Sequence, residues 1–199
     1  MLGLVRPADK DLVQRVARGD GDAFNLLVAR WERKLFNFAY RLTGDREDAL
    51  DVCQDSFIRA YEQIRQLRDA TKFSHWLFKI ARNYCASRHR SERAIPRTHG
   101  NDGEEDELGL DNLLTCSPPV RMENGHRFEP SELRLIVERA LEYLPFEQRE
   151  TVVLKIYEGL KFSEIAEITG CPVSTVKSRL YLGLTQLKKV LANNQRGAP

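Results

Sequence analysis

The stretch FSEIAEITGCPVSTVKSRLYLGL, residues 162–184, decides the fold of the C-terminal part of the chain. Gly170 permits the positive φ angle of a tight turn, and Pro172 suits the start of a new helix. Ala166 is small enough for a second helix to approach closely. The stretch therefore predicts two helices joined by a short turn, which is a helix-turn-helix.

The second of these helices, from Val173 to about Ala192, is expected to have two unlike faces. Its inward face carries apolar residues at helical spacing: Val173, Val176, Leu180, Leu184 and Leu187. Its outward face carries Ser174, Thr175, Ser178 and Tyr181, with Lys177 and Arg179 at the flanks. Short hydroxyls and a lysine can reach base edges in the major groove, while flanking cations hold phosphates. The pattern favours a DNA-reading helix over two core helices with a polar face.

The rest of the C-terminal part also has a helical pattern. Helices are expected from Ser131 to Leu144, from Pro145 to Glu158 and from Phe162 to Thr169. Pro145 fits the first turn of its helix, where a missing N–H costs nothing. Short connections between these segments predict a compact all-helical domain.

Composition indicates a soluble protein. Of 199 residues, 42% are hydrophobic and 30% are charged, and no apolar run approaches the ~20 residues that a membrane span requires. The chain does not open with a charged and then apolar leader, so we expect it in the cytoplasm without membrane insertion.

Residues 94–131 differ in composition from the segments around them. They contain half of the eight prolines and the acidic run GEEDE, and no apolar period continues through them. We therefore predict an all-α protein of two small helical domains, at 1–93 and 131–199, joined by a flexible acidic linker at 94–130.

The N-terminal domain is expected to contain four helices. The first two lie in residues 11–20 and 22–44, with Gly44 ending the second. Asp45 caps the third, with Asp48 placed as in a capping box. Its predicted apolar stripe is Ala49, Cys53, Phe57, Ala60, Tyr61 and Ile64. Outside the core we place Asp51, Gln54 and Asp55.

The fourth helix, FSHWLFKIARNYCASRHR at 73–90, mixes aromatic and cationic residues. Trp76 or Leu77, Ile80, Ala81 and Tyr84 form its predicted core stripe. Beside them stand Lys79, Arg82, Asn83, Arg88 and Arg90. Aromatic rings can stack on unpaired bases while cations neutralise the backbone. On the residues alone, a purely structural role for Phe73, Trp76 and Tyr84 is the stronger interpretation.

Charge is distributed unevenly although the net charge is only +2. Residues 45–55 contain five acids and one cation, Arg46. Residues 72–93 contain six lysines and arginines and one acid, Glu92. After Thr169 the chain has five cations and no acid. Two basic segments predict two contacts with a polyanion.

Cysteine and histidine spacing predicts neither a metal site nor a cofactor. The four cysteines, at positions 53, 85, 116 and 171, form no close pair, and no histidine lies three or four residues from another histidine. We expect buried free thiols.

Taken together, these motifs resemble the extracytoplasmic-function (ECF) group of bacterial RNA polymerase sigma factors, in the sigma-70 family. The segments DAFNLLVARW, DREDALDVCQDSFIRAYEQI and FSHWLFKIARN resemble the family's region 2. The segment LPFEQRETVVLKIYEGLKFSEIAEITGCPVSTVKSRL resembles region 4.

The resemblance implies roles for three groups of residues. Polymerase core, through the clamp helices of its largest subunit, would bind Asp51, Gln54 and Asp55. The −10 element of promoter DNA would bind as a single strand, with contacts to Arg68, Lys72, Phe73, Trp76, Lys79, Arg82 and Asn83. One of its bases would be flipped into a pocket at Asn83. The −35 duplex would contact Ser174, Thr175, Lys177, Ser178, Arg179 and Tyr181. The resemblance also implies an anti-sigma factor, often membrane-anchored.

One departure from the family pattern falls at 182–184. Family members commonly carry cations there, whereas this chain has Leu182, Gly183 and Leu184. Leu182 would either contact a thymine methyl group or pack on a protein partner.

Two other functions compete with this interpretation. A conventional helix-turn-helix regulator that binds duplex DNA without polymerase would explain residues 144–190, but it needs a sensor or receiver domain that the helical N-terminal part does not supply. A nucleic-acid enzyme needs converging carboxylates or histidines, and none are grouped here.

Overall fold

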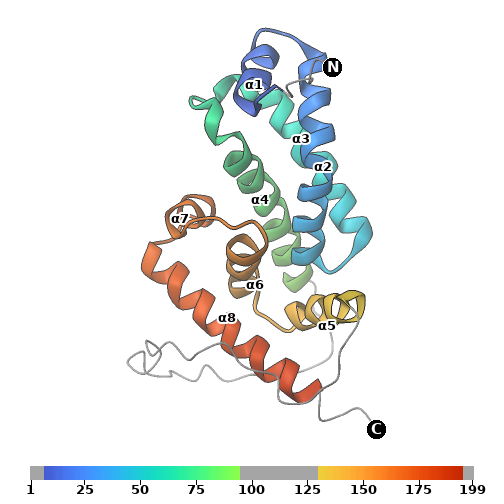
Figure 1. Ribbon diagram of the computed structural model, residues 1–199, viewed down its shortest axis with the longest axis vertical. Helices are drawn as coiled ribbons and strands as arrows, with labels where there is room; N and C mark the ends of the chain where they lie inside the picture. Colours follow the sequence, from blue (N-terminus) through green and yellow to red (C-terminus); the bar gives the residue numbers. More distant parts are fainter. Residues whose placement is uncertain (1–6, 95–129, 195–199) are drawn as a thin grey trace, which may run out of the picture.

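The computed structural model describes residues 7–94 and 130–194, and these residues form helices and turns without a β-strand (Figure 1). The all-α prediction is therefore confirmed. Apart from its two end residues, the predicted linker at 94–130 lies outside the described residues, as does Cys116. None of the helices in the described ranges combines the length and the apolar composition that crossing a bilayer requires.

The N-terminal group contains four α-helices and two short 3₁₀ turns. These are α1 (Asp9–Ala17), α2 (Gly21–Thr43), α3 (Arg46–Gln63), η1 (Ile64–Gln66), η2 (Ala70–Lys72) and α4 (Phe73–Ala94). The α2–α3 corner follows from its residues, because Gly44 adopts φ 77° and the Asp45 carboxylate accepts hydrogen bonds from the amides of Glu47 and Asp48. Asp48 does not complete a capping box, because its carboxylate pairs with Arg88 of α4 instead.

The core of this group is filled by large apolar side chains, including Leu27, Phe38 and Phe73. The predicted stripe on α3 is correct for Ala49, Cys53, Ala60 and Ile64, which are buried, and Phe57 is half-buried. Tyr61 was wrongly placed in it. Its side chain is 55% exposed and only its edge contacts the ring of Phe24, because α3 turns Val52 and Ser56 toward the core instead.

The C-terminal group contains α5 (Pro130–Glu142), α6 (Phe146–Val152), the π-helical turn η4 (Val153–Tyr157), α7 (Phe162–Thr169) and α8 (Val173–Asn194). The single helix predicted from Pro145 to Glu158 is thus α6 continued by η4, and Pro145 is its N-cap rather than its first residue. Leu141, Leu154 and Val176 lie in the core of this group.

The inward face of α8 differs from the predicted one at two positions. Val176, Leu180 and Leu187 are buried, but Val173 and Leu184 are 40% and 39% exposed. Gly183 is buried in place of Leu184. A Cβ atom added to Gly183 would lie 2.9 Å from Cγ2 of Val152, so the missing side chain is what lets α8 approach α6 closely.

The two groups pack against each other along one seam. The helix α4 lies against α6 and α7, while α2 lies against α5, α6 and η4 (Figure 1). The seam therefore brings the predicted −10 helix next to the helix-turn-helix.

Candidate nucleic-acid interface

The helix-turn-helix consists of α7, a turn at Gly170 and α8, as the sequence predicts. Gly170 ends α7 with φ 73°, and its amide donates to the carbonyl of Ala166. The amide of Val176 donates to the carbonyl of Pro172, which starts α8. Ile165 and Ile168 of α7 pack with the buried face of α8, so the opposite face of α8 points outward.

The outward face of α8 carries exposed polar side chains. Ser174, Lys177 and Tyr181 are exposed, while Thr175 and Ser178 are half-buried. The hydroxyl of Ser178 donates to the carbonyl of Ser174, 3.1 Å away, within its own helix. Leu182 is also on this face and is 43% exposed, as the spacing predicts.

Arg179 differs from the other predicted −35 residues because it points back into the protein. Its guanidinium donates to Sγ of Cys171 over 3.2 Å, and its Nη1 lies 3.7 Å from Oε1 of Glu150. In this conformation Arg179 is engaged by the chain itself rather than free for a phosphate.

The predicted −10 surface lies on α4 and the loop before it. Arg68, Lys72, Lys79 and Asn83 are exposed, and Trp76 is half-buried. Phe73 does not belong to this surface. Its side chain is 0% exposed and its ring lies 6.2 Å from that of Trp76, so it cannot stack on a base here. Phe73 packs in the core because Phe73 is the first residue of α4, and the chain turns inward at this point as it leaves η2.

Arg82 binds a fully buried carboxylate across the seam. Its Nε donates to Oε2 of Glu150 over 2.6 Å, and its Nη2 donates to Oε1 over 3.1 Å. Glu150 is 0% exposed. Burial raises the pKa of Glu150 while the Arg82 hydrogen bonds oppose that rise, and the same hydrogen bonds raise the pKa of Arg82. The bidentate geometry favours the ionised form of the pair and so acts against the effect of burial on Glu150.

Two further acids, both on α7, lie close to side chains of η2 and α4. Oε2 of Glu167 lies 3.2 Å from the ammonium of Lys72, and Oε1 of Glu164 lies 3.7 Å from Nε2 of His75. Neither Glu150, Glu164 nor Glu167 was singled out from the sequence. The sequence shows only that acidic residues precede a basic helix-turn-helix. That pattern does not reveal which residues these acids contact.

The predicted polymerase-binding residues share one exposed face of α3. Asp51, Gln54 and Asp55 all lie in solvent, and Asp51 also contacts Arg88 of α4, with 3.3 Å between Oδ2 and Nη1. Sequence reasoning missed Leu50 and Ile58, which are 49% and 51% exposed on the same face. Exposed apolar residues between acids are typical of a protein-binding surface.

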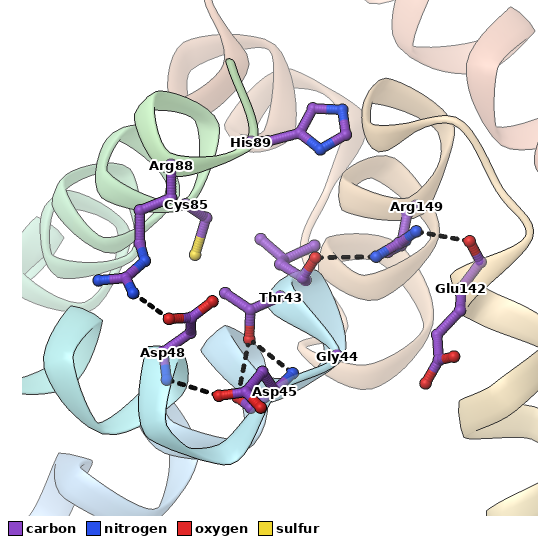
Figure 2. A pocket seen from close by; sticks show the side chains of 10 residues that line it. Thr43, Gly44, Asp45, Asp48, Cys85, Arg88, His89, Glu142 and Arg149 are labelled. Atoms are coloured by element: carbon purple, nitrogen blue, oxygen red, sulfur yellow. Dashed lines mark hydrogen bonds and ion pairs between the residues drawn. The ribbon is translucent and has the colours of Figure 1, made fainter. Parts of the chain in front are cut away.

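A cleft of about 550 Å³ opens at one end of the seam (Figure 2). Its walls come from the α2–α3 corner, the end of α4, and α5 and α6, and they include Gly44, Arg88, Glu142 and Arg149. Figure 2 shows Arg88 turned to Asp48 and Arg149 turned to main-chain carbonyls. Arg88 and Arg149 therefore stabilise the walls of the cleft through these contacts.

The three cysteines within the described ranges are free thiols. Cys53 and Cys85 are buried, which confirms the prediction for them, and Cys171 is half-buried. Burial raises the pKa of both Cys53 and Cys85 to about 12. Among the residues that the structure describes, no group of three histidine, cysteine or acidic side chains is arranged to hold a metal ion.

Comparison with known families agrees with this geometry. The model of sigma-70 region 2 matches residues 27–95, and the model of sigma-70 region 4 matches residues 134–187. The RNA polymerase sigma-H factor of Pseudomonas aeruginosa is 31% identical over 190 residues, which cover 94% of this chain and 96% of that protein. The ECF RNA polymerase sigma-E factor of Haemophilus influenzae is 35% identical over 176 residues, covering 87% and 89%.

The chain therefore belongs to the sigma-70 family of RNA polymerase sigma factors, in its ECF group. Solved structures share the fold. CnrH in complex with the cytosolic domain of CnrY matches with a TM-score of 0.66 at 24% identity, covering 94% of this chain and 99% of that one. The sigma factor RpoE of Bartonella quintana, in complex with the anti-sigma factor NepR, matches with a TM-score of 0.61 at 22% identity, covering 85% and 96%.

Proposed function

We propose that this initiation factor binds polymerase core through the exposed face of α3, holds the single-stranded −10 element on α4 and reads the −35 duplex with α8. The observation that carries the proposal is the order of the two matching family regions, because each falls on a group of helices with its own exposed polar face. In this proposal the protein confers promoter choice and aids melting, and it performs no chemistry of its own.

The family regions also support the proposed division of the chain. They cover 27–95 and 134–187, so the intervening residues match neither region. We assign 1–93 to core and −10 binding, 94–130 to a linker and 131–199 to −35 binding.

Partners and location follow from the same proposal. Promoter DNA and polymerase core place the working protein in the cytoplasm, at the nucleoid. An anti-sigma factor is the proposed restraint, by analogy with the NepR-bound RpoE of Bartonella quintana. The conventional regulator is not favoured, because both matching regions belong to sigma-70 factors.

Run-off transcription with bacterial core polymerase on promoters of the host tests the function. We expect specific initiation that depends on the protein and that is strongly reduced by Asp51→Ala and by Asn83→Ala. Asp51→Ala should weaken binding to core, whereas Asn83→Ala should leave core binding intact and impair open-complex formation.

The matched control is Asp11→Ala, because Asp11 is exposed on α1 and belongs to neither face. Equal losses in all three variants would contradict the assigned faces. Tight, sequence-specific duplex binding by the isolated chain, without stimulation of core, would instead establish the conventional regulator.

A further inference from the structure

We propose that the ring of Phe162, at the start of α7, positions Lys177 of α8 for contact with promoter DNA. This inference rests on the proposed role of α8 in reading the −35 duplex. It makes Phe162 a positioning residue, which acts on DNA only through the lysine beside it.

Two lysine ammonium groups lie beside the ring of Phe162. The ammonium of Lys155, in η4, lies 4.8 Å from the ring centre, and the ammonium of Lys177 lies 5.7 Å from it. Both distances are within the range of about 6 Å over which the quadrupole of an aromatic ring attracts a cation. One ring therefore attracts a cation from η4 and a cation from α8 to the first turn of α7.

The Phe162 ring is held firmly enough to support a mobile side chain. Phe162 is half-buried and packs against the hydrophobic core, and an aromatic side chain has few rotatable bonds. Lys155 is also fixed, because its ammonium donates to the carbonyl oxygen of Leu160 over 2.9 Å. Lys177 is exposed, so contact with the ring restricts a side chain that would otherwise sample many rotamers.

The ring contact leaves the ammonium of Lys177 available to DNA. The ring attracts the positive charge electrostatically, so the N–H groups can still donate to a phosphate or a base edge. Arg179, the neighbouring cation on α8, instead donates to Sγ of Cys171 and faces Glu150. Within residues 173–183, Lys177 is therefore the cation that faces outward.

Positioning of Lys177 lowers the cost of binding DNA. Ordering a free lysine side chain costs conformational entropy, and the ring removes part of that freedom before DNA arrives. Lys155 adds a second positive charge nearby, and a phosphate of the duplex would offset the repulsion between the two lysines. The nearby acid on α7 is Glu164, whose carboxylate accepts a hydrogen bond from the amide of Lys161 over 2.7 Å.

The first measurement tests the contact in the free, full-length protein. Protons above an aromatic ring resonate upfield, so the Hε protons of Lys177 should resonate upfield of those of Lys188, which is exposed on the same helix. This difference should disappear in Phe162→Leu and remain in Phe162→Tyr, which keeps a ring. Carbon–proton correlation spectra of lysine-labelled protein, assigned with Lys177→Arg, give these shifts.

The second measurement tests the effect on DNA binding. Core polymerase saturated with each variant is titrated onto a labelled duplex that carries the −35 element of a promoter active in run-off transcription. We expect Phe162→Leu to weaken binding about two- to fivefold, which corresponds to one exposed cation–π contact, and Phe162→Tyr to bind as the unchanged protein does. The salt dependence of affinity should stay nearly unchanged in Phe162→Leu, because no phosphate contact is removed.

A double-mutant cycle separates positioning from a purely structural role. Lys177→Ala should weaken duplex binding, and adding Phe162→Leu to Lys177→Ala should weaken it little further, because the lysine that the ring positions is gone. Equal losses from Phe162→Leu with and without Lys177 would overturn the proposal, since the ring would then act through the fold. Unchanged binding by Phe162→Leu would overturn it as well, as would Lys177 shifts that do not depend on the ring.

The matched control is Phe36→Leu in α2. Phe36 is also half-buried, and the guanidinium of Arg46 lies 5.8 Å from its ring centre. Because Phe36 belongs to the N-terminal group, its replacement should change neither the Lys177 shifts nor binding to the −35 duplex. Equal weakening by Phe36→Leu and Phe162→Leu would contradict the proposal, because it would show a general effect of losing an aromatic side chain.

Failure of the proposed function has a different signature. If α8 does not read the −35 duplex, Lys177→Ala would leave duplex binding unchanged, and so would each Phe162 variant. The Hε protons of Lys177 would still respond to Phe162→Leu in the free protein, because that contact does not depend on DNA.

Discussion

Arg149 of α6 donates a hydrogen bond from Nη1 to the carbonyl oxygen of Leu42 in α2, and these atoms lie 2.9 Å apart. Its Nη2 donates to the carbonyls of Glu142 and Leu144, at 2.7 and 3.2 Å. These carbonyls lie near the ends of α2 and α5, where main-chain oxygens lack helical partners and a cation is favourable. One side chain therefore joins two helix ends across the seam.

Arg149→Met should lower the thermal midpoint of unfolding. Burial lowers the pKa of this guanidinium, but arginine stays protonated, so the variant loses charged hydrogen bonds. A hydrogen bond to a charged group contributes about 2 kcal/mol, which corresponds to a fall of roughly 5 °C for a chain of this size. Thermal unfolding followed by circular dichroism measures it. Arg33→Met, at an exposed position of α2, is the control and should shift the midpoint by much less.

Gly183→Ala should destabilise the C-terminal helices even though alanine is the better helix former. The added methyl group would lie 2.9 Å from Cγ2 of Val152 and 3.4 Å from Cβ of Gln148. Overpacking costs about 1–3 kcal/mol, which exceeds the gain of about 1 kcal/mol in helix propensity. Denaturant unfolding of the full chain measures the difference.

Gly21→Ala is the matched control for this substitution, because Gly21 is also helical and a Cβ atom added there would have no neighbour within 4 Å. It should be neutral or stabilising. Val152→Ala in the Gly183→Ala background should recover part of the loss by making room. If Gly183→Ala is as stable as the unchanged chain, α8 does not approach α6 as closely as the structure shows.

Cys53 and Cys85 should resist alkylation in the folded protein. Burial raises the pKa of both thiols to about 12, so the reactive thiolate is scarce at pH 8. Relative to the unfolded chain, we expect alkylation to be slower by at least about a hundredfold. Peptide mass spectrometry after timed iodoacetamide treatment, with and without denaturant, gives both rates.

The half-buried Cys171 is the internal reference and should react faster than the other two.

The raised pKa values of Cys53 and Cys85 also make the free energy of unfolding depend on pH. A raised folded pKa means that the stabilisation is present at neutral pH and is lost as the pH rises above about 8.5, the unfolded value, toward 12. Rapid modification of Cys85 in folded protein would contradict its burial.

Leu182→Ala should reduce promoter-specific transcription several-fold without changing the unfolding midpoint. Leu182 is exposed on the outward face of α8, one turn after Ser178, where it can contact a thymine methyl group. Leu184→Ala, at a similarly exposed position on another side of the helix, is the control. Unchanged transcription but weakened binding to a protein partner would assign Leu182 to that partner instead.

Much of the local structure was predictable because it depends on neighbours in sequence. Gly44 and Gly170 end helices with positive φ angles, and Asp45 caps α3, as their residue types indicate. The helix-turn-helix and its outward polar face follow from apolar spacing and two turn residues. The α3 face with Asp51, Gln54 and Asp55 follows in the same way, since acids and amides avoid the core.

The choice between adjacent positions was less predictable. Phe73 was expected at the DNA surface and is buried, while Tyr61 and Leu184 were expected in the core and are exposed. Helical spacing leaves the edges of an apolar stripe undetermined by about one residue. Packing settles them, as where Gly183 rather than Leu184 faces Val152.

The sequence by itself determined the helices, their turns, the family and the separation of acidic from basic segments, because these depend on residue type and short-range spacing. Only the tertiary structure decided that Glu150 binds Arg82 and draws Arg179 inward, and that α7 places its acids against Lys72 and His75. Such pairs join residues far apart in the chain, and their formation depends on how two groups of helices pack. The physical reason is that a charged side chain has many possible partners in the sequence, and only packing brings one of them within reach.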